Sequence, residues 1–309
     1  ANREMYAKIL VALDGSEQSL AGGSIAVRLA CSIGAEIIAT HVYDVRLHAG
    51  RFRDMEPVLP EKYQQEDRLR SLRDAHEDLM SEGFDALSQG YIDQFTERAR
   101  GSGVGVSQVH RQGRNYVVLR DLVTELGVDL LVLGASGLAG VDGALGSNAA
   151  RLLQLVSCDV LVARKPLSEE GPITIGIDGS DESGHAARRA ATWARLFGRR
   201  LRLAAAYDPH FHSQVFTTMS QALTPERQNQ VGIVKQEKLH DEIIDSGLGD
   251  LYRSFLDSTA SRLEGAAGEI DVALLQGKAY AALTRDATEA RADLLVVGRY
   301  GHHRTDVVR

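Results

Sequence analysis

Residues Asp129–Gly137 have the sequence Asp-Leu-Leu-Val-Leu-Gly-Ala-Ser-Gly, an apolar run that stops at a glycine. Such a run predicts a buried strand of a parallel sheet. After a loop of eight residues, Gly146 and Ser147 precede a helical pattern from Asn148 to Leu155. Glycines just past a strand let backbone approach a ligand closely. The helix start would add free N–H groups, a hydroxyl group and the positive end of a helix dipole, so the stretch is typical of a site for an anion such as a phosphate.

The same stretch occurs a second time, because Asp293–Gly301 has a matching sequence 164 residues downstream. Three further pairs of segments match at this offset without a gap: Leu13–Ser16 with Ile177–Ser180, Val42–Asp44 with Ala206–Asp208, and Gln112–Tyr116 with Gln276–Tyr280. Four matches at one offset indicate a tandem duplication.

The length of 309 residues is typical of two domains of about 150 residues each. We predict domains at 1–165 and 172–309, joined by a short linker. The second copy stops before the counterparts of Gly146-Ser147, the last helix and the fifth strand, so we expect it to be incomplete at its C-terminal end. An open sheet without its edge strand exposes apolar surface. We therefore expect the native chain to continue past Arg309, or a partner to cover the gap.

Composition limits the partners. A formal net charge of −7 without a long Lys/Arg block argues against nucleic acid as the main partner. The two cysteines, Cys31 and Cys158, lie in apolar or small-residue contexts, which favours reduced core residues of a cytoplasmic protein over a disulfide framework. No signal peptide is visible, and no apolar run approaches the roughly 18–20 residues of a membrane span.

Strands and helices alternate along the first copy. We predict strands at Lys8–Leu13, Glu36–Tyr43, Val104–His110, Asp129–Leu133 and Asp159–Ala163. Helices are predicted after Ser16 to about Cys31, over Val117–Leu126, and from Asn148 to about Val156. This order predicts an α/β fold with a doubly wound, Rossmann-like parallel sheet in each of the two tandem domains.

Each copy carries a long insertion after its second strand, over residues 46–103 and 210–265. In the first we predict a loop over Arg46–Pro60 and a charged helix from Glu61 to about Ser81. Gly83 is expected to break it, and a second helix is expected to run to about Arg100. Apolar residues at helical spacing anchor this second helix: Phe84, Leu87, Tyr91, Ile92 and Phe95.

These features resemble the universal stress protein family, in the tandem form with two such domains in one chain. The resemblance rests on Asp14–Ser16 after the first strand, on the apolar run before Gly134, and on Gly134 and Gly137 followed by Gly146-Ser147. ATP-binding members have nine residues between the second glycine and the Gly-Ser pair, and this chain has eight. The resemblance implies the adenine nucleotide alpha-hydrolase-like version of the fold.

The resemblance also implies that the first domain binds ATP or another adenine nucleotide. Asp14 would lie by the adenosine end, Val42 would present its backbone to the adenine, and Gly134 would lie by the ribose. The phosphates would be held by Gly137, Gly146, Ser147 and Asn148.

Charge around the phosphates is a concern, because the loop 138–145 contains Asp142 and neither Lys nor Arg. A magnesium ion bound with the nucleotide, or Arg151, would have to compensate. The second copy keeps Gly298 and Gly301 without a following Gly-Ser pair, so we predict no nucleotide there.

Two functions remain open. The first is a stress-response regulatory protein in which ATP or AMP occupancy changes conformation or partner choice. The second is a nucleotide-independent scaffold that docks a protein through the helical insertions. A protein partner or a homo-oligomer is expected in both cases, with the edge strand Asp159–Ala163 as the natural seam.

Catalysis is not indicated. The chain has no defensible Ser/His/Asp order, no cysteine in a nucleophile context and no Walker lysine. We predict no catalytic residues and at most slow ATP hydrolysis.

Duplicated histidines form one further pattern, since His48 and His76 recur as His212 and His240 beside acidic residues. Such pairs could bind a transition metal. Solvent-facing helix residues kept by copying are the simpler interpretation, and no metal site is predicted.

Overall fold

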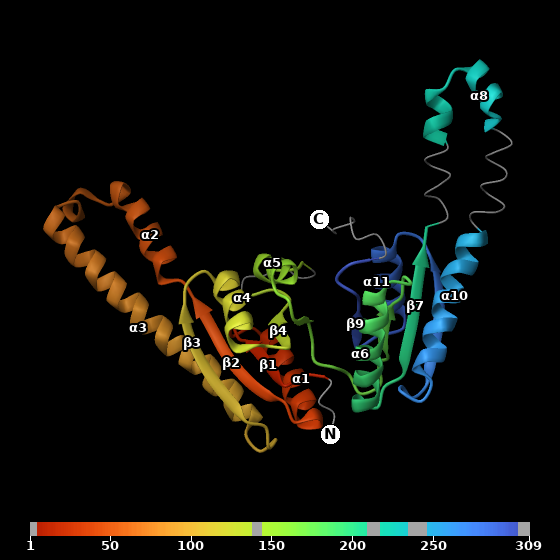
Figure 1. Cartoon of the computed structure of the whole chain (residues 1–309). Helices are drawn as coiled ribbons and strands as arrows, with labels where there is room; N and C mark the ends of the chain where they lie inside the picture. The colour runs from red at the N-terminus through yellow and green to blue at the C-terminus, as the bar shows by residue number, and fades with distance from the viewer. Residues whose placement is uncertain (1–4, 138–143, 209–216, 234–245, 302–309) are drawn as a thin grey trace. The chain divides into compact units, whose positions relative to one another are not determined.

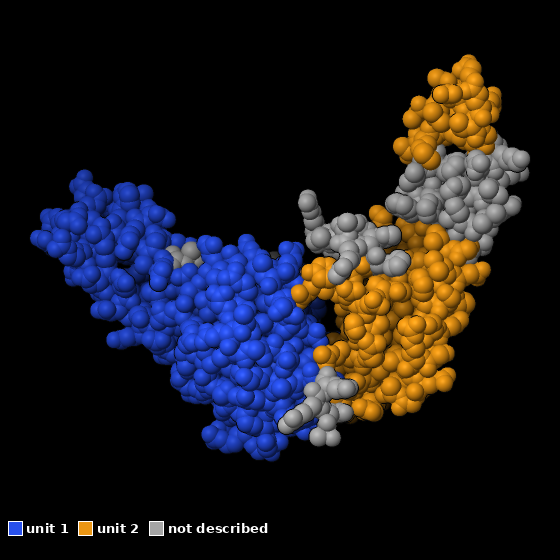
Figure 2. Space-filling model, in the orientation of Figure 1, with its two compact units in different colours: residues 1–166 blue, residues 167–309 orange. Residues whose placement is uncertain are grey.

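The structure, a computed structural model, describes residues 5–137, 144–208, 217–233 and 246–301. The chain divides into two compact units, Ala1–Pro166 and Leu167–Arg309 (Figure 2). Each unit is built on its own parallel sheet and is described separately.

The first unit contains a five-stranded parallel sheet in the order β3-β2-β1-β4-β5 (Figure 1). Its strands are β1 Lys8–Ala12, β2 Glu36–Tyr43, β3 Val106–Gln112, β4 Leu130–Gly134 and β5 Asp159–Ala163. The order reverses between β1 and β4, as in a doubly wound sheet. The fold class and all five strands predicted for the first copy are confirmed.

Helices cover both faces of this sheet (Figure 1). They are α1 Glu17–Ile33, α4 Asn115–Leu126 and α5 Ser147–Leu155, together with the insertion helices. Ser16 begins α1 by accepting a hydrogen bond from the Ser19 N–H at 3.1 Å, and Gly34 ends it in the left-handed conformation. The core between the sheet and the α4/α5 layer includes Leu10, Ile38, Leu122, Leu131 and Leu152. Burying each such side chain stabilises the fold by about 1.5–3 kcal/mol.

The insertion of the first unit is more helical than predicted. Instead of a loop over Arg46–Pro60, the chain forms α2 Val45–Met55 and the short turn η1 Glu56–Val58, then a second short turn, η2 Glu61–Tyr63. Asp44 caps α2 by accepting from the Arg46 N–H at 3.1 Å. The loop prediction is wrong, and α2 does carry apolar residues at helical spacing, at Val45, Ala49, Phe52 and Met55. Contacts with the next helix hold it in place.

That next helix, α3, runs without interruption over Glu66–Ala99, so the predicted break at Gly83 is wrong. A glycine inside a helix costs about 1 kcal/mol but keeps its N–H and does not clash, unlike proline. The Arg73 guanidinium pairs with both carboxylate oxygens of Glu56 at 2.6 Å, and Phe52 stacks on His76 with ring centroids 4.7 Å apart. Figure 1 shows that α2 and the first half of α3 project beyond the sheet.

The second unit repeats the plan with four described strands in the order β8-β7-β6-β9. They are β6 Ile173–Gly176, β7 Leu201–Tyr207, β8 Ile270–Gln276 and β9 Leu294–Val296. Its helices include α6 Asp181–Phe197, α8 Pro225–Val231, α10 Ser246–Leu263 and α11 Ala279–Glu289. As expected, helices follow the second strand in this copy too.

The cysteines differ from the prediction in one case. Cys31 is exposed and donates to the Ser102 carbonyl at 3.3 Å, so it is not a core residue. Cys158 is half-buried and packs against the core. Within the described ranges, no helix combines the length and the apolar character that crossing a membrane would require.

Candidate functional site

The candidate site lies at the carboxyl ends of β1 and β4, where the strand order reverses and where sheets of this type bind ligands. Gly134, the last residue of β4, lies directly against the start of α1. A Cβ atom on Gly134 would come within 3.0 Å of the Ser19 backbone nitrogen. A side chain at this position would push the two elements apart by a few tenths of an ångström, so glycine lets them approach closely.

Asp14 follows β1 and faces two ways. Its Oδ1 accepts hydrogen bonds from the Ser16 N–H at 3.0 Å and from the Ser16 hydroxyl at 2.5 Å, which forms the turn into α1. Its Oδ2 points toward the glycine loop, because a Cβ on Gly137 would be 3.3 Å from that oxygen. The structure thus brings Asp14 and Gly137 into contact.

Val42 contributes through its backbone. Its side chain is buried in the core. The ladder between β1 and β2 ends where the Leu13 N–H donates to the Thr40 carbonyl at 2.8 Å. Neighbouring residues of a strand alternate in the direction of their polar groups, so the N–H and C=O of Val42 point the same way as those of Thr40. They face the space beyond the end of β1.

Gly146 joins the start of α5 to the end of β4. Its N–H donates to the Ala135 carbonyl at 2.7 Å, and a Cβ on Gly146 would lie 3.2 Å from that oxygen. The expectation of a free N–H at Gly146 is therefore wrong. Ser147 and Asn148 are exposed, and α5 begins without a side-chain cap. The N–H groups of this first turn have no partner within the helix, and Ser147 and Asn148 have no backbone acceptor among the described residues.

Cations gather beside the start of α5. Arg151 lies one turn after Ser147, and its guanidinium carbon is 5.0 Å from the centre of the Tyr116 ring. Arg114 donates to the Tyr116 hydroxyl at 3.4 Å. This hydrogen bond, with the nearby arginine charges, lowers the pKa of Tyr116. Asp142, the acidic residue of the preceding loop, lies outside the described residues.

The long helix α3 reaches the site, which the sequence did not indicate. The ring of Tyr91 lies over Gly15, where an added Cβ would be 2.4 Å from Cε1. Tyr91 also meets His41 edge-on, with centroids 5.2 Å apart, and His41 Nδ1 is 2.6 Å from the Ser88 hydroxyl. The matching positions Tyr91 and Phe255 are both aromatic, which is the one sequence signal that could have shown this contact.

Two further contacts fix the site. Gln18 at the start of α1 accepts from the Ser136 N–H at 2.7 Å, which ties α1 to the glycine loop. Tyr43 donates to Asp85 on α3 and accepts from Gln112 at 2.8 Å. Burial, with the hydrogen bond to Asp85, raises the pKa of Tyr43 to about 12, so this hydroxyl stays protonated.

Burial lowers the pKa of His41, although the charge of Asp14 opposes the shift. The fold therefore favours the neutral imidazole, and the unfolded chain binds more protons once the pH falls to about 6.5. We therefore expect the free energy of unfolding of the first domain to decrease as the pH is lowered through this range. The His41→Ala variant, which carries the alanine found at the matching Ala205, should lose less stability between roughly pH 7.5 and 5.5. Chemical denaturation at several pH values measures this, and parallel profiles for the two proteins would contradict it.

The second unit reproduces the first half of the site. The Ser180 N–H donates to Asp178 Oδ1 at 2.9 Å, and a Cβ on Gly301 would be 3.3 Å from Asp178 Oδ2. The position of His41 is taken by Ala205, and Tyr252 occupies the position of Ser88. Burial and the charge of Asp178 raise the pKa of Tyr252.

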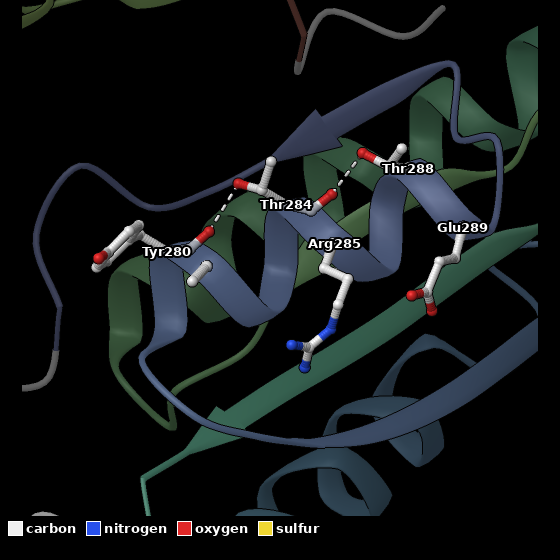
Figure 3. Close-up of a pocket in the computed structure, with 6 residues that line it drawn as sticks. Tyr280, Thr284, Arg285, Thr288 and Glu289 are labelled. Carbon is white, nitrogen blue, oxygen red and sulfur yellow. Dashed lines mark hydrogen bonds between the residues drawn. The ribbon is translucent and has the colours of Figure 1, made fainter.

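The start of α5, which forms one side of the candidate site in the first unit, has no counterpart among the described residues of the second unit. One face of α11 instead lines a surface depression of about 470 Å³ (Figure 3). Tyr280 is 74% exposed there, whereas its counterpart Tyr116 packs against the core of the first unit. The hydroxyls of Thr284 and Thr288 donate to carbonyls of their own helix at 2.6 and 2.7 Å, so they offer the depression no free donor.

No cluster of three or more His, Cys, Asp or Glu side chains suited to a metal ion occurs in the described part of the chain. His76 stacks on Phe52. The side chain of His48, together with His212 and His240, lies outside the described residues.

Comparison with known proteins gives consistent matches. A family model for the universal stress protein family matches residues 5–164 and 171–308. The universal stress protein MJ0531 of Methanocaldococcus jannaschii is 28% identical over 166 residues, which cover 53% of this chain and 86% of that protein. The universal stress protein YxiE of Bacillus subtilis is 29% identical over 161 residues, which cover 52% of this chain and 100% of that protein.

Two solved structures match most of this chain. A universal stress protein from Archaeoglobus fulgidus gives a TM-score of 0.53 at 14% identity, covering 94% of this chain and 85% of its own. A functionally unknown protein from Pseudomonas aeruginosa PAO1 gives a TM-score of 0.54 at 14% identity, and the match covers 99% of this chain and 88% of that protein's chain. At this identity the two structures show the fold alone.

Proposed function

Because the chain belongs to the universal stress protein family, with two such domains in tandem, we propose that it is a stress-response regulatory protein whose first domain binds an adenine nucleotide. Nucleotide binding is typical of the family. The observation that carries the proposal for this chain is the contact of Asp14 Oδ2 with Gly137, beside an α5 start that Gly146 anchors.

In this proposal the nucleotide lies across the ends of β1, β2 and β4. The adenine meets the backbone of Val42, the ribose lies by Gly134, and Asp14 faces the adenosine end. The phosphates meet the first N–H groups of α5, at Ser147 and Asn148. Arg151, one turn later, supplies positive charge, and a magnesium ion would add more.

The protein would act through conformation and choice of partner rather than through catalysis, in the cytoplasm. Since α3 contributes Tyr91 and Ser88 beside Asp14, binding of a nucleotide in the site would change the contacts that hold the insertion helices. The second domain is not proposed to bind a nucleotide through the residues described.

Nucleotide binding can be tested first on freshly purified protein, denatured and analysed by chromatography with mass detection. About one adenine nucleotide per chain supports the proposal. If the protein is purified empty, calorimetric titration with ATP replaces this measurement. Absence of a bound nucleotide together with absence of binding at millimolar ATP would contradict it.

Gly137→Ala is expected to weaken ATP binding about tenfold, equivalent to about 1.4 kcal/mol, because its methyl group would crowd Asp14 and the ligand. Gly301→Ala is a matched control, since a Cβ there meets Asp178 at the same 3.3 Å. Calorimetric titration measures both variants. An equal loss of affinity in the two variants would contradict a nucleotide site confined to the first domain.

A nucleotide-independent scaffold is the second candidate. The projecting hairpin of α2 and α3 favours it, because Met55, Val58 and Leu79 are more than half exposed. Failure of the ATP experiments would leave this function as the better one.

A further inference from the structure

Helix α3 has two unlike faces. One face is buried against the domain and carries Ser88, Ile92, Phe95 and Ala99. The opposite face carries apolar and small residues at intervals of three or four positions, which places them in one line along the helix. We call this line the outer stripe: Leu72, Ala75, Leu79, Gly83, Ala86 and Gly90.

The outer stripe has no partner within the described parts of the chain. Leu72 is 36% exposed and Leu79 is 63% exposed. A Cβ on Gly83 or Gly90 would meet nothing within 4 Å. Within one copy these glycines only weaken the helix. They become useful if a second backbone approaches closely.

Charges at the two ends of the outer stripe indicate that the second backbone is another copy of α3. Arg68 continues the line at its N-terminal end, and Asp93 and Glu97 continue it at its C-terminal end. All three are exposed on the same side as the stripe; within one copy Glu97 also pairs with Arg100 at 2.6 Å, and Arg68 donates to the Lys62 carbonyl at 2.9 Å. An antiparallel copy of α3 would place Arg68 beside Glu97 of the partner subunit at both ends, whereas a parallel copy would place arginine beside arginine.

We propose that two copies of this protein associate through the outer stripes of antiparallel α3 helices. The two-fold axis passes between Glu82 and Gly83. In this register Leu79 lies against Ala86 of the partner subunit, and Ala75 lies against Gly90 of the partner subunit. Ala75, Ala86 and Gly90 are small, which permits close packing of the helices around the axis, and Leu72 lies against Asp93 of the partner subunit nearer each end.

The second unit does not carry this surface. At the positions that match Ala86 and Gly90, helix α10 has Asp250 and Ser254. A charge in the middle of the line would oppose pairing of that helix. Association is therefore confined to the first unit, and it does not depend on nucleotide binding. A single helix pair buries an area at the low end of specific interfaces, so we expect a dissociation constant of roughly micromolar order.

The first test is sedimentation velocity of the full chain across a concentration series. Wild type should show a monomer–dimer equilibrium, and Leu79→Glu and Ala86→Asp should raise the dissociation constant at least about tenfold. Ala86→Asp introduces the residue that α10 carries at the matching position. Val58→Glu is the control, because Val58 is 79% exposed on the same hairpin but lies off the stripe. A wild-type protein that stays monomeric at roughly 200 μM, far above the expected range, would overturn the proposal.

Gly83→Glu separates association from folding. Glutamate is a better helix former than glycine, so thermal unfolding should occur at the same or a higher temperature. Association should nevertheless be lost. A variant that folds well and still dimerises like wild type would overturn the proposal.

Disulfide cross-linking tests the antiparallel arrangement. In a chain with Cys31→Ser and Cys158→Ala, Gly83→Cys lies beside the axis and should cross-link two chains under mild oxidation. Leu72→Cys should not, because two such residues would be about 30 Å apart along the helices. Efficient cross-linking of Leu72→Cys would indicate parallel pairing and overturn the proposed register.

A charge exchange tests the ends of the contact. Arg68→Glu should weaken association about three- to tenfold, since an exposed ion pair is lost at each end. Adding Glu97→Arg in the same chain should restore it, because the pairs re-form with reversed sign. Failure of the second change to restore any affinity would contradict the pairing of Arg68 with Glu97 of the partner subunit.

Discussion

Asp286→Leu is expected to destabilise the second domain by about 3 kcal/mol. Asp286 is 7% exposed and accepts two hydrogen bonds from Arg202, at 2.9 Å to Nε and 2.7 Å to Nη2. Removing the carboxylate leaves a guanidinium in a partly buried position without its partner, which typically costs 3–5 kcal/mol. The lower end applies because the Arg202 side chain is 25% exposed and Asp271 also acts on its charge.

The duplicated domain offers a matched rescue. At the positions of Arg202 and Asp286 the first unit has Ile38 and Leu122, which are 4% and 1% exposed in its core. The free energy of unfolding of the double variant, Arg202→Ile with Asp286→Leu, should therefore lie within about 1 kcal/mol of the wild-type value. Replacing both members of a buried ion pair by well-packed apolar residues is often neutral or stabilising.

Urea denaturation followed by tryptophan fluorescence measures both variants. The chain has one tryptophan, Trp193, which is 4% exposed in α6 of the second unit, so its signal reports unfolding of that unit. A double variant no more stable than Asp286→Leu would show that the ion pair does not explain the loss.

Gly15→Ala is expected to destabilise the first domain by about 2–4 kcal/mol. Gly15 has a φ of +77°, where a side chain is strained, and its Cβ would lie 2.4 Å from the Tyr91 ring. The backbone strain accounts for roughly 1 kcal/mol. The larger part is the displacement of Tyr91, which would also disturb its contact with His41.

Gly127→Ala isolates the backbone contribution. Gly127 also has a positive φ, +62°, but an added Cβ there meets nothing within 4 Å. The Gly127→Ala substitution should lower the free energy of unfolding by only about 1 kcal/mol. Thermal unfolding followed by circular dichroism compares the two variants. Equal losses would show that the contact of Tyr91 with Gly15 contributes nothing.

The strands were predictable because their signals are local. An apolar run such as Leu130–Leu133 must be buried on both faces wherever it is placed, and a parallel sheet provides this. Ser16 and Gly34 likewise mark the ends of α1 by their own chemistry. The helix α2 was missed because it is held against α3 by contacts such as the stacking of Phe52 on His76, and the sequence does not show which residues meet.

The candidate site was predictable in part. The glycine pattern placed Gly134, Gly137 and Gly146 near the strand ends, and the contact of Gly137 with Asp14 agrees with that expectation. The bond from the Gly146 N–H to Ala135 was not predictable, because it depends on how the intervening loop closes.

The sequence by itself determined the duplication, the succession of strands and helices along the chain, and the family, since repeated segments, apolar runs and glycine spacing are all written in the order of residues. Only the tertiary structure decided that α3 is continuous, that its Tyr91 and Ser88 reach the site beside Asp14 and His41, and that no described residue covers its outer stripe. These features depend on which face of a long helix the sheet buries. That choice is made by packing between residues far apart in the chain, which a local pattern does not specify.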